Sequence, residues 1–400
     1  MPVVPDAVLV GPPYASQPDR TRGRCYPEPG APTRNDFQRD RDRVIHSTAF
    51  RRLVYKTQVF LNHEGDLFRT RMTHSLEVAQ LGRSIARVLG LNEDLVEAIS
   101  LAHDLGHTPF GHAGQDALNA CMVEAAGAGG EARSLHEPCG GFEHNMQSLR
   151  VVDELEERYP AFNGLNLCFE TREGILKHCS RANAEWLEAR EPGGVGHRFL
   201  VQQSPSLEAQ LANLADEIAY NAHDIDDGVR SGLLTLEQLE AVPLFARYLQ
   251  STLRDFPALK GRKVLFEAIR RMLSEQIYDV IAATRDALKA ARVETVDDVR
   301  QLPVLVRFSA DMRRESQELK QFLFRNLYRH PQVMSTTGQA RTVVADLFRA
   351  YCQRPVEMPA ASAESVAVSL SRQVADYIAG MTDRFALREH ERLTGRKLFG

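Results

Sequence analysis

Apolar residues recur every three or four positions from about residue 40 to the C-terminal end of this chain. A clear example follows His74 and consists of Leu76, Ala79, Ile85 and Leu89. This spacing places apolar side chains on one face of an α-helix. Segments that alternate apolar and polar residues over the length of a strand are rare. We therefore predict an all-α fold with at most one short β-hairpin, between Val59 and Phe68, where Gly65 could form the turn.

Sequence character divides the chain into three parts. Residues 1–36 are rich in proline and contain few periodic apolar positions, so we predict an irregular N-terminal tail. Residues 37–230 form the predicted core, and residues 231–400 form a predicted helical part packed on that core. The arginines of the tail are expected to be solvated charges, with contact to a neighbouring subunit or an anionic ligand as the alternative: Arg20, Arg22 and Arg24.

Local signals predict several helix boundaries. Asn92 is placed to cap a helix that ends at His103. Ser204 and Pro205 are expected to be the N-cap and the first residue of a long helix. Residues 124–141 are rich in glycine and alanine and are predicted to form a loop between two parts of the site.

Composition narrows the class of protein. Hydrophobic residues make up 43% of the chain and charged residues 26%, as in a globular protein. No run of about 18 apolar residues and no signal-peptide pattern is present, so we expect a cytoplasmic protein with no membrane partner. The six cysteines are scattered without a CxxC pair and are expected to be reduced thiols. A net charge of −4 argues against a globally basic nucleic-acid binder.

The segment from His103 to His112 holds three histidines and one aspartate within ten residues. It directly follows an apolar helical pattern, so His103 and Asp104 are expected at the C-terminal turn of a helix. The glycine and proline that come next stop the helix and fold the chain back. An adjacent imidazole and carboxylate can bind a divalent metal, although one such pair is a weak signal.

A polar stripe is predicted on the long helix that begins near residue 205. Its members lie at offsets of 0, 4, 7 and 8 and therefore share one face: Asp216, Tyr220, His223 and Asp224. A separate apolar face is formed by Leu211, Leu214, Ile218 and Ile225. A polar stripe usually faces water, but a helix with a second, apolar face can use the stripe to line a cleft.

Several motifs resemble those of a known enzyme family. The order His…His-Asp…Asp is that of the HD metal-dependent phosphohydrolases, and here it is formed by His74, His103, Asp104 and Asp216. With segments 39–47, 50–59, 71–75, 142–145 and 216–220, these motifs resemble the bacterial deoxyguanosine triphosphate triphosphohydrolase family, relatives of the mammalian dNTP triphosphohydrolase. The motifs cover roughly residues 37–230, and further resemblance rests mainly on Lys320 to Val333.

The resemblance implies a divalent metal site. The implied ligands are His74, His103, Asp104 and Asp216. This mixed nitrogen and oxygen set suits Mn, Mg, Fe, Co or Ni. It is a poor match for a structural zinc site, which is closed and usually rich in thiolates.

The resemblance also implies a reaction. Attack at the α-phosphorus of a dNTP would give a deoxynucleoside and inorganic triphosphate. His107 and His144 are the implied phosphate contacts, and His112 is the implied general acid for the departing 5′-oxygen. Near relatives commonly place an acidic residue three positions after this last histidine, where this chain has Gln115 followed by Asp116. Either Asp116 substitutes, or His112 is weakly tuned, or Gln115 is a helix-surface residue.

Substrate contacts are implied by the same resemblance. The implied substrate residues are Gln58, Arg71, Tyr220, Asp224, Lys320 and Tyr328. A tyrosine packed beneath C2′ would exclude a ribose 2′-hydroxyl, and Arg71 can bind a phosphate in a bidentate manner. The preferred base is not readable from the sequence.

Two further functions remain open on sequence grounds. One is an HD nucleotidase or phosphodiesterase that acts on another nucleotide, because HD chemistry supports many substrates. The other is a weakly catalytic oligomer that senses nucleotides or binds single-stranded DNA. The family implies a homo-oligomer, a hexamer or tetramer. Some members need a dNTP activator, but Arg51 and Val54 replace the activator-pocket residues of the mammalian enzyme.

Overall fold

The computed structural model describes residues 11–58, 68–129, 140–359 and 368–399. The described residues contain eighteen α-helices and isolated β-bridges, including one between Thr57 and Thr70, so the predicted all-α fold is confirmed. The hairpin predicted between Val59 and Phe68 falls almost entirely outside the described residues. None of the described helices combines the length and the apolar character that crossing a bilayer would require.

The helices of the N-terminal half are α1 (Asp36–His46), α2 (Thr48–Arg52), α3 (Arg71–Leu89), α4 (Glu93–Ala102), α5 (Gly111–Gly129), α6 (His144–Arg150), α7 (Phe169–Ile175), α8 (Arg181–Arg190) and α9 (His197–Leu200). Those of the C-terminal half are α10 (Leu207–Arg230), α11 (Leu236–Leu239), α12 (Pro243–Asp255), α13 (Arg262–Ala291), α14 (Val296–Gln301), α15 (Ala310–Leu323), α16 (Pro331–Gln353), α17 (Leu370–Ala379) and α18 (Asp383–Thr394). π-Helical turns extend α6 over Val151–Leu155 and α15 over Phe324–Tyr328.

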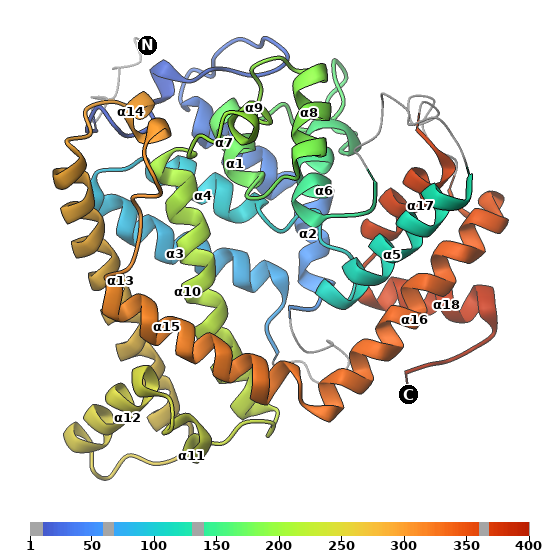
Figure 1. Cartoon of the computed structure of the whole chain (residues 1–400). Helices are drawn as coiled ribbons and strands as arrows, with labels where there is room; N and C mark the ends of the chain where they lie inside the picture. Colours follow the sequence, from blue (N-terminus) through green and yellow to red (C-terminus); the bar gives the residue numbers. More distant parts are fainter. Residues whose placement is uncertain (1–10, 59–67, 130–139, 360–367, 400) are drawn as a thin grey trace.

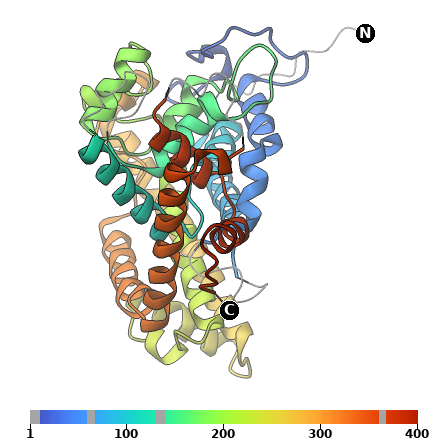
Figure 2. The ribbon, with the colours of Figure 1, turned by 90° about the vertical axis from the view of Figure 1, so that its right-hand side faces the viewer.

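Helices α3, α4 and α10 pack against one another at the centre of the molecule (Figure 1). Helix α13 covers this centre on one side, and α5 packs with α16, α17 and α18 on the other (Figure 2). The predicted apolar face of α10 is confirmed, since these side chains are at most 4% exposed: Leu211, Leu214, Ile218 and Ile225. The opposite, polar stripe of α10 is thereby directed toward the helices that carry the histidines.

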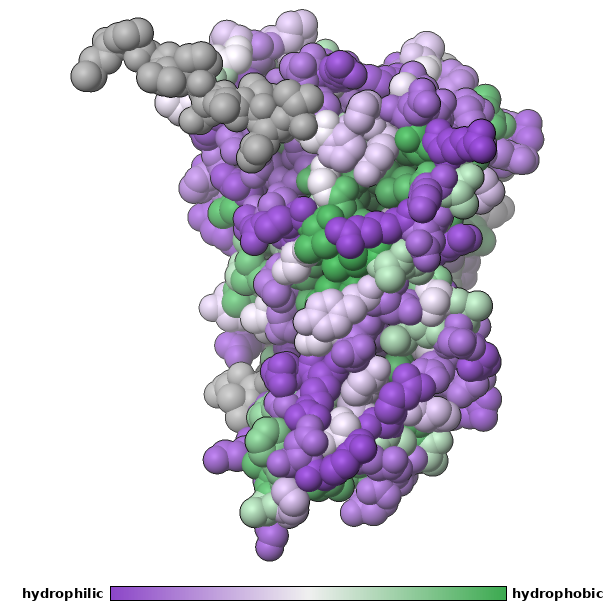
Figure 3. Space-filling view, turned by 90° about the vertical axis from the view of Figure 1, so that its left-hand side faces the viewer, coloured by the Kyte–Doolittle hydropathy of each residue, from purple (hydrophilic) through white to green (hydrophobic). Residues whose placement is uncertain are grey.

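The face of the molecule that carries α13 shows apolar side chains interleaved with charged ones (Figure 3). A hollow of about 560 Å³ is lined by residues of α3 and α13, including Val88, Leu288 and Arg285. None of the residues that line it belongs to the predicted site. This hollow is therefore separate from the predicted site.

Helix caps decide where the central helices begin. The Asn92 side chain accepts a hydrogen bond from the backbone N–H of Leu95 at 3.0 Å, as predicted for the start of α4. The predicted start of α10 is wrong by two residues, because its N-cap is Ser206. The hydroxyl of Ser204 instead donates to the carbonyl of Leu302 at 2.7 Å, so a tertiary contact uses the group that the sequence offers as a cap.

The predicted loop over residues 124–141 is partly helical. Helix α5 continues through residue 129, and residues 130–139 lie outside the described part of the chain. Alanine has the highest helix propensity of all residues, and three of the six residues at 124–129 are alanine. The favourable helix propensity of the alanines therefore exceeds the unfavourable propensity of the glycines over residues 124–129.

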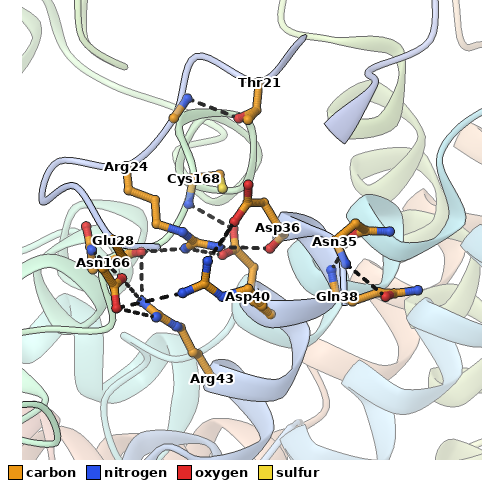
Figure 4. A network of polar contacts seen from close by, with 12 residues as sticks. Thr21, Arg24, Glu28, Asn35, Asp36, Gln38, Asp40, Arg43, Asn166 and Cys168 are labelled. Atoms are coloured by element: carbon orange, nitrogen blue, oxygen red, sulfur yellow. Dashed lines mark hydrogen bonds and ion pairs between the residues drawn. The ribbon is translucent and has the colours of Figure 1, made fainter. Parts of the chain in front are cut away.

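The prediction that the tail arginines are solvated is wrong for Arg24 (Figure 4). Its guanidinium donates to Asp40 Oδ1 at 2.5 Å and to the carbonyl of Asn166 at 2.6 Å, and its side chain is only 6% exposed. Asp40 is fully buried and also accepts from the backbone N–H of Cys168 at 2.8 Å. A buried carboxylate needs such a partner, so Arg24 ties the N-terminal segment to α1 and to the segment before α7.

Candidate active site

Three of the predicted metal ligands meet where α3, α4 and α10 approach one another. His74 lies in the first turn of α3, His103 caps the C-terminal end of α4, and Asp216 lies in the middle of α10. One potential ligand atom from each residue lies within 4.8 Å of those of the other two. Residues separated by more than a hundred positions thus form one compact group.

The local sequence explains why the two histidines sit at helix ends. A capping box formed by Thr70 and Thr73 starts α3, so His74 falls in its first turn. Helix α4 ends at His103, whose Nδ1 lies 2.6 Å from the carbonyl of Ser100 in the preceding turn. This contact directs Nε2 of His103 toward α10.

The polar atoms of this group fit a cation. A neutral His103 that donates from Nδ1 presents a lone pair at Nε2, which lies 3.2 Å from Asp104 Oδ1 and 3.6 Å from Asp216 Oδ1. His103 Nε2 is buried and has no hydrogen-bond partner among the described residues. Nε2 of His74 lies 2.9 Å from the same oxygen of Asp216. Acceptors that converge in this way are stabilised by a metal ion, so the residues present fit a divalent cation.

Asp104, the fourth predicted ligand, lies beside this group. Its Oδ2 accepts a hydrogen bond from Arg71 Nη1 at 2.8 Å, and its Oδ1 lies 3.1 Å from Nδ1 of His107. Both Asp104 and Arg71 are buried. The predicted phosphate-binding Arg71 is therefore paired with a predicted ligand, which places one positive charge next to the metal group.

Lys177 is a residue that the sequence analysis missed. Its Nζ lies 2.6 Å from Asp216 Oδ2, and its side chain is 10% exposed. Burial opposes ionisation of Asp216, but the charge of Lys177 prevails and lowers the pKa of this carboxyl well below its usual value. A single lysine just after α7 carries no sequence signal that would have distinguished it from a solvated one.

The three predicted catalytic histidines form a second cluster next to the first. The ring centres of His107 and His144 are 4.0 Å apart, and the ring of His112 lies 5.8 Å from the first and 6.2 Å from the second. Burial lowers the pKa of His144 to about 3. Burial and the charge of Arg71 also lower the pKa of His107 well below its usual value. His107 and His144 are therefore neutral at pH 7 and can accept as well as donate a proton.

Gln115 contacts His144 and not His112. Its Oε1 accepts from the backbone N–H of His144 at 3.2 Å and lies 2.7 Å from Nδ1 of the same residue. The idea that Gln115 is a helix-surface residue is thus wrong. Asp116 forms an exposed ion pair with Arg341 at 2.8 Å. Because an amide oxygen only accepts, Gln115 keeps the proton of His144 on Nδ1 and leaves Nε2 as an acceptor.

The predicted sugar contacts also come together. The rings of Tyr220 and Tyr328 are stacked with their centres 6.3 Å apart, and the hydroxyl of Tyr328 donates to Asp224. Burial raises the pKa of Asp224 well above its usual value. Gln58 is buried, and its Oε1 has no partner among the described residues. Lys320 is exposed on α15, and no hydrogen bond joins it to the other predicted residues in the described part of the chain.

Comparison with known proteins agrees with this geometry. Residues 71–221 match the family model of the HD domain, and residues 306–392 match that of the phosphohydrolase-associated domain. A deoxyguanosinetriphosphate triphosphohydrolase-like protein of Ralstonia nicotianae is 60% identical over 95% of this chain and 94% of its own length. Proteins of the same description from Bordetella pertussis and Thiobacillus denitrificans are 59% and 57% identical over 95% of this chain, covering 95% and 96% of their own lengths. The chain therefore belongs to the deoxyguanosinetriphosphate triphosphohydrolase-like family of HD-domain phosphohydrolases.

Proposed function

We propose that this protein hydrolyses dNTPs, dGTP among them, to deoxynucleoside and inorganic triphosphate with the help of a divalent metal. The observation that carries the proposal is the convergence of potential ligand atoms from His74, His103 and Asp216 beside the clustered rings of His107, His112 and His144. The relatives are described by their likeness to a deoxyguanosine triphosphate triphosphohydrolase, which suggests the class of substrate.

His74, His103 and Asp216 would hold the metal, with Asp104 alongside. A divalent metal in this place neutralises charge on a phosphate and makes water easier to deprotonate. Phosphoryl substitution depends mainly on positioning and on charge stabilisation. Mn, Mg, Fe, Co and Ni all suit the donor set, and which one is native stays open.

The chain's own cations and histidines would position the triphosphate. Arg71 and Lys177 are paired with Asp104 and Asp216, and both can turn part of their donors to phosphate oxygens. Nδ1 of His144 is held by Gln115, so its Nε2 accepts a proton from a nucleophilic water or a hydrogen bond from a protonated phosphate. His112, the exposed member of the cluster, would donate a proton to the departing oxygen.

Tyr220 and Tyr328 would select deoxyribose. Their stacked rings form a flat surface beside His74, and Tyr328 orients Asp224. A sugar packed on Tyr220 leaves no space for a 2′-hydroxyl, whereas the Asp224 carboxylate can accept from a 3′-hydroxyl. Assembly into a hexamer or tetramer, a dNTP activator and binding of single-stranded DNA stay predictions.

Product analysis tests the proposal. The purified protein is incubated with Mn²⁺ and each dNTP, singly and as a mixture, and the products are separated by anion exchange. Deoxynucleoside and inorganic triphosphate in equal amounts are expected, and turnover only in the mixture would identify an activator requirement. Release of orthophosphate or pyrophosphate, or turnover of another nucleotide alone, would contradict the proposal and favour a different HD nucleotidase or phosphodiesterase.

A further inference from the structure

His223 belongs to the polar stripe of α10, and neither the resemblance nor the proposed function gives it a role. It is buried, with 2% of its surface exposed, and its ring lies at 82° to that of His74 with the ring centres 5.2 Å apart. Nδ1 of His223 lies 3.2 Å from Nδ1 of His74. Its Nε2 contacts Glu77, one turn along α3 from His74.

These contacts allow one arrangement of protons when His223 is neutral. An ionised Glu77 can only accept, so the proton of His223 is on Nε2 and its Nδ1 carries a lone pair. That lone pair needs a donor, and the only atom of His74 that meets it is Nδ1. His74 then has its proton on Nδ1 and a lone pair on Nε2, the atom that lies 2.9 Å from Asp216 and belongs to the metal group.

We propose that His223 is a positioning residue, which with Glu77 holds His74 in the tautomer and orientation that a metal ligand requires. The inference rests on the metal centre of the proposed function but not on the identity of its substrate. Metal-binding histidines usually donate their second N–H to a carboxylate or a carbonyl, and loss of that partner costs about 10- to 100-fold in metal affinity. Here His223 lies between the ligand His74 and the carboxylate of Glu77.

The other ligand histidine is held in a different way. His103 uses the backbone carbonyl of Ser100 in its own helix, a contact that no side-chain substitution removes. The partner of His74 comes from α10, the helix that also supplies Asp216 seven residues earlier. Helix α10 packs against α3 (Figure 1), and residues seven positions apart share a helix face, so Asp216 and His223 both reach His74.

The test is the affinity of the metal-free full-length protein for Mn²⁺, measured by titration calorimetry and by the EPR signal of free Mn²⁺. His223→Leu removes both contacts and should weaken binding about 10- to 100-fold. His223→Gln retains an acceptor and a donor and should recover most of that loss. Glu77→Ala, at a side chain that is 44% exposed, should weaken binding by a smaller factor and covers the case in which His223→Leu does not fold.

His390 provides the matched control. It is as deeply buried as His223 and contacts a carboxylate in the same way, with Nε2 at 3.1 Å from Asp346, but it lies in the C-terminal part of the chain. His390→Leu should lower the melting temperature of the metal-free protein and leave the Kd for Mn²⁺ unchanged. Equal Kd values for the unmodified protein, Glu77→Ala and any folded His223 variant would overturn the inference alone. No Mn²⁺ binding by the unmodified protein would overturn the metal centre and the proposed function together.

Discussion

The HD-domain region at 71–221 and the phosphohydrolase-associated region at 306–392 contribute to the site in different ways. The first contains the grouped side chains of His74, His103 and Asp216 and the neighbouring rings of His107, His112 and His144. The second supplies Tyr328 and, in addition, contacts that hold the backbone of the first. The candidate metal ligands thus lie in the first region, whereas Asp383, which holds the backbone N–H of Phe110, lies in the second.

The support acts on the turn that carries His107. Asp383 is buried and accepts hydrogen bonds from the backbone N–H groups of Thr57 at 2.9 Å and Phe110 at 3.0 Å. Phe110 has a φ of 64°, a conformation that costs free energy for a bulky residue and persists only where its surroundings enforce it. Lys56 adds a second connection, because its Nζ donates to the carbonyls of His107 and of Ala379. The conformation of the turn that carries His107 therefore depends on residues far away in the sequence.

The largest loss of metal binding and turnover is expected from a substitution in the HD-domain region at 71–221. His103→Ala should abolish Mn²⁺ binding and lower turnover by about a thousandfold or more, because it removes one of three grouped ligands. Calorimetry and product analysis measure the two losses. His178→Ala, at an exposed histidine outside the group, should leave both unchanged. Full activity of the His103 variant would show that the group is not the active centre.

The next largest effect, on stability and turnover, is expected from a substitution in the phosphohydrolase-associated region at 306–392. Asp383→Ala leaves two buried backbone N–H groups without an acceptor and should lower the free energy of unfolding by about 3 kcal/mol. Turnover should fall while the Kd for Mn²⁺ stays the same, because the metal group does not contact Asp383. Urea unfolding and product analysis test this, with Asp311→Ala at an 81% exposed side chain as the control. A loss of Mn²⁺ binding would show that the two regions are not separable.

The burial of Lys56 predicts that the free energy of unfolding depends on pH. Burial and the charges of Arg52 and Arg71 lower the pKa of Lys56 from its ordinary value of 10.5 to about 7. Between these values the unfolded chain binds more protons than the folded one, so stability rises with pH. The free energy of unfolding, relative to Lys56→Met, should increase by about 2 kcal/mol from pH 7 to pH 9. A difference that stays constant with pH would mean that Lys56 remains charged in the fold.

Tyr220 of the first region stacks on Tyr328 of the second, and both would contact the sugar in the proposed function. Tyr220→Ala opens space beneath C2′ and should raise the relative rate with ribonucleotides about tenfold or more. Competition between dGTP and GTP, followed by product analysis, measures the ratio. If ribonucleotides remain excluded by this variant, the steric explanation is wrong and the polar groups of Asp224 and Gln58 decide the preference.

The smallest effect, a shift of the pH profile, is expected from a substitution of Gln115 in the HD-domain region. Gln115→Glu places a carboxylate beside His144 and should raise the pKa of this histidine from about 3 by about one unit. If neutral His144 is required, activity is lost as pH falls through this pKa, so the acidic limb of the pH profile should move up by about one unit. Gln115→Met, which cannot carry charge, should leave the limb in place. An unchanged limb in the Glu variant would exclude His144 as the titrating group.

Features that depend on a few neighbouring residues were predicted correctly. The helical spacing gave the all-α fold, Asn92 was identified as a cap, and the periodicity of α10 separated its buried face from its polar stripe. His74, His103, Asp104 and Asp216 were predicted as one set of ligands, but only through the resemblance, because spacing along the chain does not bring three helices together. The structure groups His74, His103 and Asp216, with Asp104 beside them. The errors at Arg24 and Ser204 have a common cause, since each side chain makes a contact with a residue more than 90 positions away.

By itself, the sequence determined which segments are helical and which residue types are available for chemistry, because helix formation depends on contacts within a turn or two. Only the tertiary structure decided which of those residues act together. Gln115 reaches His144 rather than His112, Lys177 reaches Asp216, and Ala379 reaches Lys56. The partner of a buried polar group is set by the packing of whole helices, and that packing is determined by the sum of many apolar contacts rather than by any local signal.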